Sequence, residues 1–146
     1  MDILSNLSKS IKETMEVKGI RAPALANVLG CNRSTLTRYT AGTSTPNLEL
    51  FIKLIQYFGV SADVMLGLKE YVRETEFLEA LPFGERLVCV LKEYGVTQYA
   101  LIKKTGLSWA LLYKWTHNQG LPSVENVAKI AQALDCRVDY LLGRIR

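Results

Sequence analysis

Residues 19–46 of this chain read GIRAPALANVLGCNRSTLTRYTAGTSTP, and residues 95–122 read GVTQYALIKKTGLSWALLYKWTHNQGLP. The second stretch follows the first at a constant offset of 76 residues, and no gap is needed up to the Leu-Gly pairs at 66–67 and 142–143. The alignment of residues 19–67 with residues 95–143 has 49 positions, of which thirteen are identical. Ordinary composition would give roughly three identical positions. The chain is therefore expected to contain two tandem copies of one small domain.

The repeat predicts how the chain is divided. A length of 146 residues suffices for two domains of roughly 65 residues, near the lower limit for a self-sufficient core. We expect domain 1 at 1–67, a connector at 68–82 and domain 2 at 83–146. The connector is rich in Glu and has interspersed apolar residues. It is expected to be helical, packed on another surface, and stopped by Pro82.

Composition excludes several protein classes. No apolar run approaches the roughly 20 residues that span a bilayer, and residues 1–10 do not resemble a signal peptide. The three cysteines, an odd number with no close pair, argue against a disulfide framework or a zinc site and predict reduced core thiols in a cytoplasmic protein. The net charge of +4 and the isoelectric point of about 9.0 are compatible with a polyanionic partner.

Each copy is expected to form five short helices and no strand. In copy one, apolar residues recur at helical spacing from Leu4 to Met15. The second helix is predicted at 22–29, with its apolar residues facing inward, and the third at 33–41. The inward residues expected in the second helix are Ala24, Leu25 and Val28. The predicted N-caps are Asn32, Asn47 and Ser61 in copy one and Thr97, Ser108 and Ser123 in copy two.

The second and third helices of each copy have the features of a helix-turn-helix. Gly30 and Gly106 stand at the turn, where a residue free to take positive φ is needed. Leu36 and Leu112 lie midway along the following helix, where an apolar residue holds that helix on the core. In such a unit the first helix crosses the DNA backbone, and the second enters the major groove by its N-terminal turn.

At these residues the chain resembles the lambda-repressor-like helix-turn-helix family, also called the Cro or xenobiotic-response-element type. The matches in copy two are Gln98, Leu101, Gly106, Ser108, Leu112, Trp115, Pro122, Ser123, Ala131, Leu134, Leu141 and Leu142. Those in copy one are Leu25, Ala26, Gly30, Leu36, Tyr39, Gly42, Pro46, Leu54 and Leu66. The resemblance implies an all-α protein of two tandem five-helix domains that bind duplex DNA, usually to regulate transcription. It places Tyr39 and Trp115 in the two cores.

The resemblance also implies which residues of copy one face DNA. Arg33, Ser34 and Arg38 would point into the major groove, with Asn32 and Thr37 beside them. Arginine can bond guanine O6 and N7 in bidentate fashion, and the shorter polar side chains reach bases or phosphates. Copy one has Ala22 where the family usually has Gln, and the neighbouring Arg21 is expected to replace part of that contact.

Copy two presents a different set at the same places. It keeps Gln98, has Ser108 before the recognition helix, and would turn Trp109, Ala110, Tyr113 and Lys114 toward the groove. Ala110 suits a thymine methyl group and Tyr113 a phosphate. Trp109 has no obvious base partner, and exposed Trp and Tyr often mark a protein contact. Further candidates for phosphate contacts are Lys103, Lys104, Arg137, Arg144 and Arg146.

Two functions remain in competition. The first is a sequence-specific transcriptional regulator, a repressor that occludes a promoter, acting as a covalent pseudo-dimer or as a homodimer with four motifs. The second is an interaction or oligomerisation module in which one or both copies have lost base readout. An enzyme is not expected, because one His (His117) gives no Ser-His-Asp set and no Gly-rich phosphate loop is present. No metal, cofactor or small-molecule substrate is expected.

Overall fold

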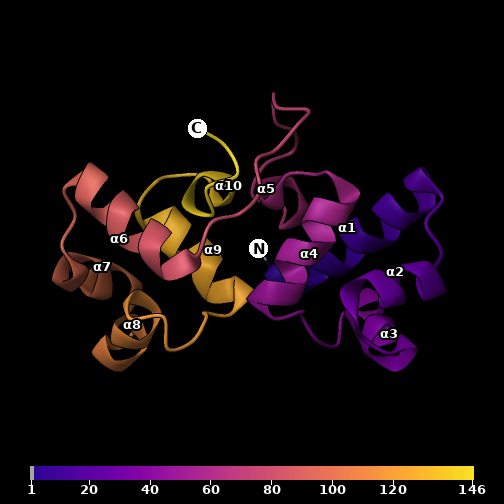
Figure 1. Cartoon of the computed structure of the whole chain (residues 1–146), viewed down its shortest axis with the longest axis horizontal. Coiled ribbons are helices and arrows are strands. Elements are labelled where there is room, and N and C mark those ends of the chain that lie inside the picture. Colours follow the sequence, from indigo (N-terminus) through magenta and orange to yellow (C-terminus); the bar gives the residue numbers. More distant parts are fainter. Residues whose placement is uncertain (1) are drawn as a thin grey trace. The chain divides into compact units, whose positions relative to one another are not determined.

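The structure, a computed structural model, describes residues 2–146, and its regular elements are all helices. The chain divides into two compact units at the bond between Phe77 and Leu78. We call the part up to Phe77 unit 1 and the part from Leu78 to Arg146 unit 2 (Figure 1). The division falls inside the segment predicted to connect the two domains.

Within residues 2–146 each unit contains five helices, which confirms the all-α prediction. Those of unit 1 are α1 (Ile3–Lys18), α2 (Ala22–Leu29), α3 (Arg33–Ala41), α4 (Leu48–Phe58) and α5 (Ala62–Met65). Those of unit 2 are α6 (Phe83–Tyr94), α7 (Gln98–Thr105), α8 (Trp109–Thr116), α9 (Val124–Ala133) and α10 (Val138–Leu141). The two copies therefore have the same order of elements, with the helix-turn-helix at α2–α3 and at α7–α8.

The helices begin where the capping residues predict. All six predicted N-caps are confirmed, each accepting a hydrogen bond from a backbone N–H of the first helical turn. The Asn32 amide oxygen accepts from the Thr35 N–H at 2.8 Å, and the Ser108 hydroxyl accepts from the Leu111 N–H at 3.2 Å. Such caps satisfy N–H groups that have no partner inside the helix. They fix the first turn of α3 and of α8.

The inward faces of α3 and α8 are held by the residues that the pattern singled out. Leu36 and Leu112 are buried, and so are Tyr39 and Trp115 three residues later. Burial raises the pKa of the Tyr39 hydroxyl. In unit 2 the rings of Phe83 and Trp115 meet edge to face with centroids 6.4 Å apart, a favourable arrangement for aromatic pairs. The opposite faces of α3 and α8 are left at the surface.

The inward face of α2 differs from the prediction. Ala24 and Val28 are exposed, whereas Leu25, Ala26 and Leu29 are buried. The helix is thus rotated by about one residue relative to the predicted face. Only one residue of α2 is polar, so the sequence offered little contrast between its two sides.

The prediction of a helical connector is wrong. Residues 68–82 form bends and irregular chain instead. The Leu78 N–H donates to the Arg144 carbonyl at 2.8 Å, and the Leu81 N–H donates to the Leu142 carbonyl at 3.0 Å. In a helix these groups would bind carbonyls four residues earlier. Pairing with the end of unit 2 has replaced the helical bonds.

The first half of the connector also lacks the buried face expected of an amphipathic helix. Tyr71, an aromatic residue of this segment, is 82 % exposed. Glu70 and Glu74 would stand one turn apart on a helix and repel each other. The Glu-rich composition therefore opposes the helix that its propensities favour.

The cysteines are free but are not core residues. Cys89 is exposed, and Cys31 and Cys136 are half-buried. The prediction of free thiols is confirmed, and the prediction that they lie in the core is wrong. Within residues 2–146, no helix is both long enough and apolar enough to cross a membrane.

Candidate nucleic-acid interface

The turn between the two helices of each motif depends on a left-handed glycine. Gly30 has φ of 70° and Gly106 has φ of 73°. Each glycine follows the end of the first helix and reverses the chain, so that the second helix starts at Arg33 or at Trp109. A side chain at this φ costs free energy in any L-residue. The glycine thereby sets the angle at which α3 and α8 leave the core.

The outer face of α3 carries the polar and basic residues predicted to contact DNA. Arg33, Ser34, Thr37 and Arg38 are all exposed. The Thr37 hydroxyl donates to the Arg33 carbonyl at 2.8 Å, and an Arg38 guanidinium N–H donates to the Thr35 hydroxyl at 3.3 Å. These bonds orient Thr37 and Arg38 along the helix. They use the hydroxyl proton of Thr37 and leave most of the guanidinium N–H donors of Arg38 available.

Asn32 has less free hydrogen-bonding capacity than the sequence indicates. Its side-chain oxygen accepts from the Thr35 N–H and from the hydroxyls of Ser34 and Thr35. That oxygen is fully used by the cap, so only the amide NH₂ can donate to a base or phosphate. Arg21 is exposed at the start of α2, where no side chain caps the helix. The N–H groups of that first turn suit a phosphate oxygen.

The outer face of α8 is aromatic at the places where α3 is basic. Trp109 is 53 % and Tyr113 is 54 % exposed, and Ala110 and Lys114 beside them are also exposed. Gln98, the first residue of α7, is half-buried. The hydroxyl of Ser108 is engaged as the α8 cap, which leaves its second lone pair and its proton for other partners.

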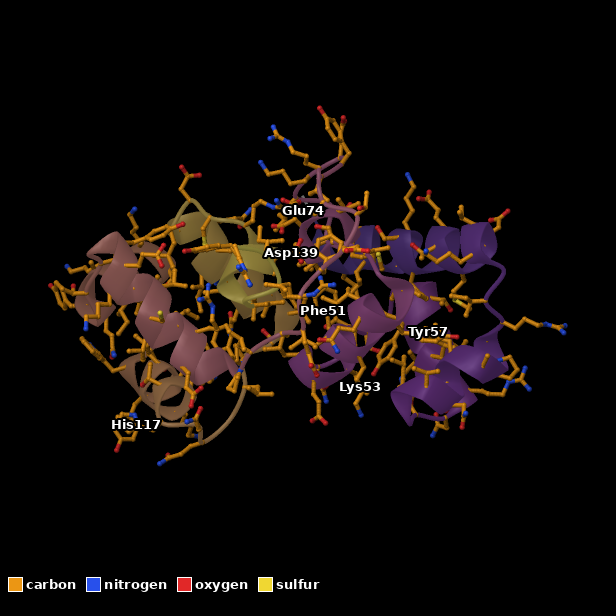
Figure 2. The ribbon with its side chains drawn as sticks, turned by 45° about the horizontal axis from the view of Figure 1, so that its top comes forward. Phe51, Lys53, Tyr57, Glu74, His117 and Asp139 are labelled. Atoms are coloured by element: carbon orange, nitrogen blue, oxygen red, sulfur yellow. The ribbon has the colours of Figure 1, made fainter. Side chains whose placement is uncertain are left out.

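His117, for which the sequence pattern predicts no role, contacts this face. Its ring stacks on Tyr113 with centroids 3.8 Å apart, and its Nδ1 lies 2.8 Å from the Tyr113 carbonyl oxygen. Figure 2 places His117 at the outer edge of unit 2, well apart from Asp139 in α10. The i, i+4 spacing from Tyr113 is the signal that could have identified it.

Both motifs lie in long segments without acidic residues. No Asp or Glu occurs from residue 17 to 48 or from residue 94 to 124, although the chain has 14 in total. The cations of the first segment are Lys18, Arg21, Arg33 and Arg38, and those of the second are Lys103, Lys104 and Lys114. Uniform charge of this kind attracts a polyanion and costs no like-charge repulsion against phosphate. This pattern, which the composition as a whole conceals, is readable from the sequence.

Some of the cations predicted to contact phosphate are used inside unit 2. Arg144 is only 1 % exposed, and its guanidinium donates to the buried Asp139 carboxylate at 2.7 Å. Arg137 also bonds Asp139, at 3.3 Å. The prediction of a phosphate contact is therefore wrong for Arg144. The Lys104 ammonium donates to the Ala133 carbonyl at 3.2 Å but remains exposed.

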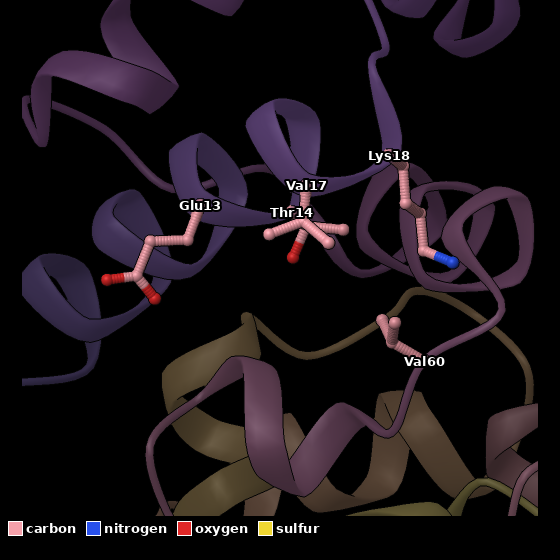
Figure 3. A pocket seen from close by; sticks show the side chains of 5 residues that line it. All are labelled: Glu13, Thr14, Val17, Lys18 and Val60. Carbon is pink, nitrogen blue, oxygen red and sulfur yellow. The ribbon is translucent and has the colours of Figure 1, made fainter.

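A pocket in unit 1 lies outside the helix-turn-helix. It has a volume of about 280 Å³ and is formed by α1 and the turn between α4 and α5, with Val60 opposite the α1 side chains (Figure 3). Its lining residues are Glu13, Thr14, Val17, Lys18 and Val60. Four of the five belong to α1, and none belongs to α2 or α3, so it is not part of the candidate interface.

The matching region of unit 2 contains a pair of tyrosines. The rings of Tyr94 and Tyr140 stack with centroids 6.2 Å apart, and the Tyr140 hydroxyl donates to Glu93. That hydrogen bond raises the pKa of Tyr140. Among the described residues, His, Cys, Asp and Glu do not gather in groups of three or more that could hold a metal ion.

Comparison with known families finds two separate matches in this chain. Residues 11–65 match a family described as helix-turn-helix, and residues 86–146 match the Cro/C1-type HTH DNA-binding domain. Each match contains one of the glycine turns and the recognition helix that follows it. No solved structure matches the chain at a comparable level.

Two curated proteins are similar to part of the chain. The transcriptional repressor RstR of the cryptic phage CTXphi in Vibrio cholerae serotype O1 is 38 % identical over 60 residues, which cover 41 % of this chain and 54 % of that protein. Repressor protein C2 of Salmonella phage P22 is 36 % identical over 59 residues, which cover 40 % of this chain and 27 % of that protein. The chain thus spans about half or less of the length of these relatives.

Proposed function

We propose that this chain, which carries two Cro/C1-type helix-turn-helix domains in tandem, binds duplex DNA at specific sequences and represses transcription. The observation that carries the proposal is the pair of acid-free segments, each with an exposed recognition helix behind a glycine turn. Cations on these faces supply the attraction to phosphate. The exposed side chains of α3 and α8 supply the contacts to base edges.

Unit 1 carries the more specific readout in this proposal. Arg33 lies in the first turn of α3, the part of a recognition helix that reaches deepest into the major groove. Arg38 lies just over one turn later on the exposed side. Both guanidinium groups can donate two parallel hydrogen bonds to a guanine. Ser34 and Thr37 lie between them. Both donate their hydroxyl protons within the protein, and their oxygens can accept from an amino group on a base edge.

Repression follows from occupancy of the DNA. Two domains on a promoter would exclude the transcription machinery without a separate effector domain. The names of both similar proteins support this direction of regulation. The proposal includes the cytoplasmic location expected from the sequence, where thiols such as the three free cysteines stay reduced.

A second candidate function rests on the aromatic face of α8. Trp109 and Tyr113 are more than half exposed, and large exposed aromatic side chains are typical of protein interfaces. In this alternative, unit 2 binds a protein or a second copy of the chain, which would make the protein a homodimer. Unit 1 then carries all of the DNA readout.

Selection of bound sites from random duplex DNA, followed by measurement of affinity, tests the proposal. Arg33→Ala and Arg38→Ala should each cost about 1–3 kcal/mol on the selected site and relax the preference at one base pair. Lys9→Ala is the matched control, because Lys9 is an exposed cation of α1 that pairs with Glu13 outside the motif. It should leave the base preferences unchanged.

The dependence of DNA affinity on salt separates the two candidates. A groove-binding protein that neutralises several phosphates should lose affinity steeply as salt rises, with a log–log slope of about −0.9 for each phosphate neutralised. An interaction module should show negligible DNA affinity at every salt concentration. Failure to enrich any sequence, together with a flat salt dependence, would refute the DNA-binding proposal.

A further inference from the structure

We infer that unit 2 recognises the 5-methyl group of pyrimidine bases, which thymine and 5-methylcytosine share, through the apolar outer face of α8. This inference rests on the DNA-binding function proposed above and specifies what its second domain reads. We call Trp109, Ala110 and Tyr113 the methyl-reading face. All three are exposed, and they lie on the first and second turns of α8.

The duplication itself provides the comparison that points to this ligand. The 76-residue offset aligns Arg33 with Trp109, Ser34 with Ala110, and Thr37 with Tyr113. Both helices start after a capped turn, and all six of these residues are exposed. The architecture is therefore retained while the chemistry of the side chains changes. Each exchange replaces a polar or charged side chain by one with more apolar surface. The side chains at these positions of unit 2 are therefore less suited to hydrogen bonds with polar base edges than those of unit 1.

The charges around the face favour nucleic acid over a protein as its occupant. The face lies in the middle of the acid-free segment 94–124, with exposed Lys103 and Lys114 on α7 and α8. The Lys103 ammonium lies 5.5 Å from the centre of the Tyr99 ring. An aromatic surface in a segment whose charged residues are all cations complements a ligand that is anionic at its edge and partly apolar within. The DNA major groove has both properties, because phosphates border it and pyrimidine methyl groups project into it.

The side chains of the face can make few of the other contacts available in the groove. Ala110 has no hydrogen-bonding group, and Trp109 has one N–H donor and no acceptor. Neither can form the bidentate bonds by which guanine and adenine are read. A methyl group, in contrast, needs only an apolar surface, and its burial removes apolar area from water on both partners.

The geometry of Tyr113 is fixed before any ligand binds. One face of its ring is covered by His117, at 3.8 Å between centroids, and the Nδ1 of His117 is held 2.8 Å from the Tyr113 carbonyl oxygen. The exposed remainder of the ring is consequently presented in one orientation. A rigid apolar surface loses less conformational entropy on binding than a mobile one.

The test replaces single thymines by deoxyuridine in the duplex that the full-length protein selects from random DNA. This change removes a methyl group and leaves every hydrogen-bonding atom in place. Loss of one contacted methyl should weaken binding by about threefold to fivefold. The loss should be confined to thymines in the half-site bound by unit 2. It should vanish in Trp109→Ala and persist in Arg33→Ala, which is the matched variant at the same place in unit 1.

A second arm detects the methyl group on another base. At a position sensitive to deoxyuridine, the thymine pair is replaced by cytosine–guanine, with and without a 5-methyl group on the cytosine. The methylated duplex should bind about threefold to fivefold more tightly than the unmethylated one. Trp109→Ala should bind the two equally.

The outcomes separate failure of this inference from failure of the proposed function. Steep salt dependence with no effect of deoxyuridine at any position would overturn methyl reading and leave DNA binding intact. So would an effect of Trp109→Ala on self-association, seen by sedimentation, without an effect on DNA affinity. If no duplex is selected at any salt concentration, the proposed function and this inference both fail.

Discussion

At the scale of single residues, the two units use one buried carboxylate differently. Asp63 and Asp139 occupy matching positions, and both are buried. In unit 2 the Asp139 carboxylate bonds the guanidinium groups of Arg137 and Arg144, where unit 1 has Ser61 and Leu68. A sequence reader sees only cations near the C-terminus of a basic protein. The burial of these cations depends on a tertiary contact that the local sequence pattern does not contain. For this reason the prediction that Arg144 contacts phosphate is wrong.

Replacing Arg144 tests this buried ion pair. Arg144→Ala removes a guanidinium partner of the buried Asp139, and breaking such a pair is expected to lower the free energy of unfolding of unit 2 by about 3–5 kcal/mol. Denaturant unfolding followed by Trp fluorescence reports on unit 2, because both tryptophans, Trp109 and Trp115, lie there. Arg146→Ala is the control, since Arg146 is exposed, and its effect should stay within about 0.5 kcal/mol. Equal stability of the two variants would contradict the structural role.

At the scale of helices and turns, most of the fold was readable from the sequence. Caps and glycines act on their immediate neighbours, so their effects can be inferred locally, and every predicted N-cap was found. The prediction of a helical connector failed because the N–H groups of Leu78 and Leu81 bind carbonyls more than 60 residues further along the chain. The prediction of the buried face of α2 failed because this helix is apolar on nearly all sides. The assignment of DNA-facing residues remains a prediction, although α3 and α8 do expose the recognition-helix residues it names.

The turn glycines are the elements most open to a direct test. Apart from the two chain neighbours, no heavy atom lies within 4 Å of where a Cβ would be placed at Gly30 or Gly106. A substitution there is therefore strained by φ alone and not by a clash. Gly30→Val and Gly106→Val should each destabilise their own unit by more than about 1 kcal/mol, because a β-branched residue fits the left-handed region poorly.

Thermal or chemical unfolding of these variants supplies the measurement. Ala24→Val is the control in the preceding helix, since Ala24 is exposed and the change should cost only about 0.5 kcal/mol through helix propensity. If the glycine variants lose no more stability than this control, the left-handed turn does not set the geometry of the motif.

At the scale of the whole molecule, the duplication places two candidate DNA-binding surfaces on one chain. Binding of one domain holds the second near the DNA at an effective concentration set by the connector. The connector has bends and no regular secondary structure, so it does not hold the two domains at a distance set by a rigid helix. A chain of this kind can act alone as a covalent pseudo-dimer, without a second copy.

One chain should therefore bind a duplex with two half-sites far more tightly than a duplex with either half-site alone. We expect a difference of about 10²-fold or more, the lower end of the gain typical of linked binding modules. Titration against both duplexes measures the gain, and sedimentation of the saturated complex counts the chains. The pseudo-dimer requires one chain for each two-half-site duplex. Two chains on that duplex would instead support the homodimer with four motifs, and Trp109→Ala would then show whether the aromatic face of α8 joins them. Equal affinity for the duplexes with one and with two half-sites would mean that only one of the two units binds DNA. That unit would be unit 1, because α3 is basic whereas the exposed face of α8 is aromatic.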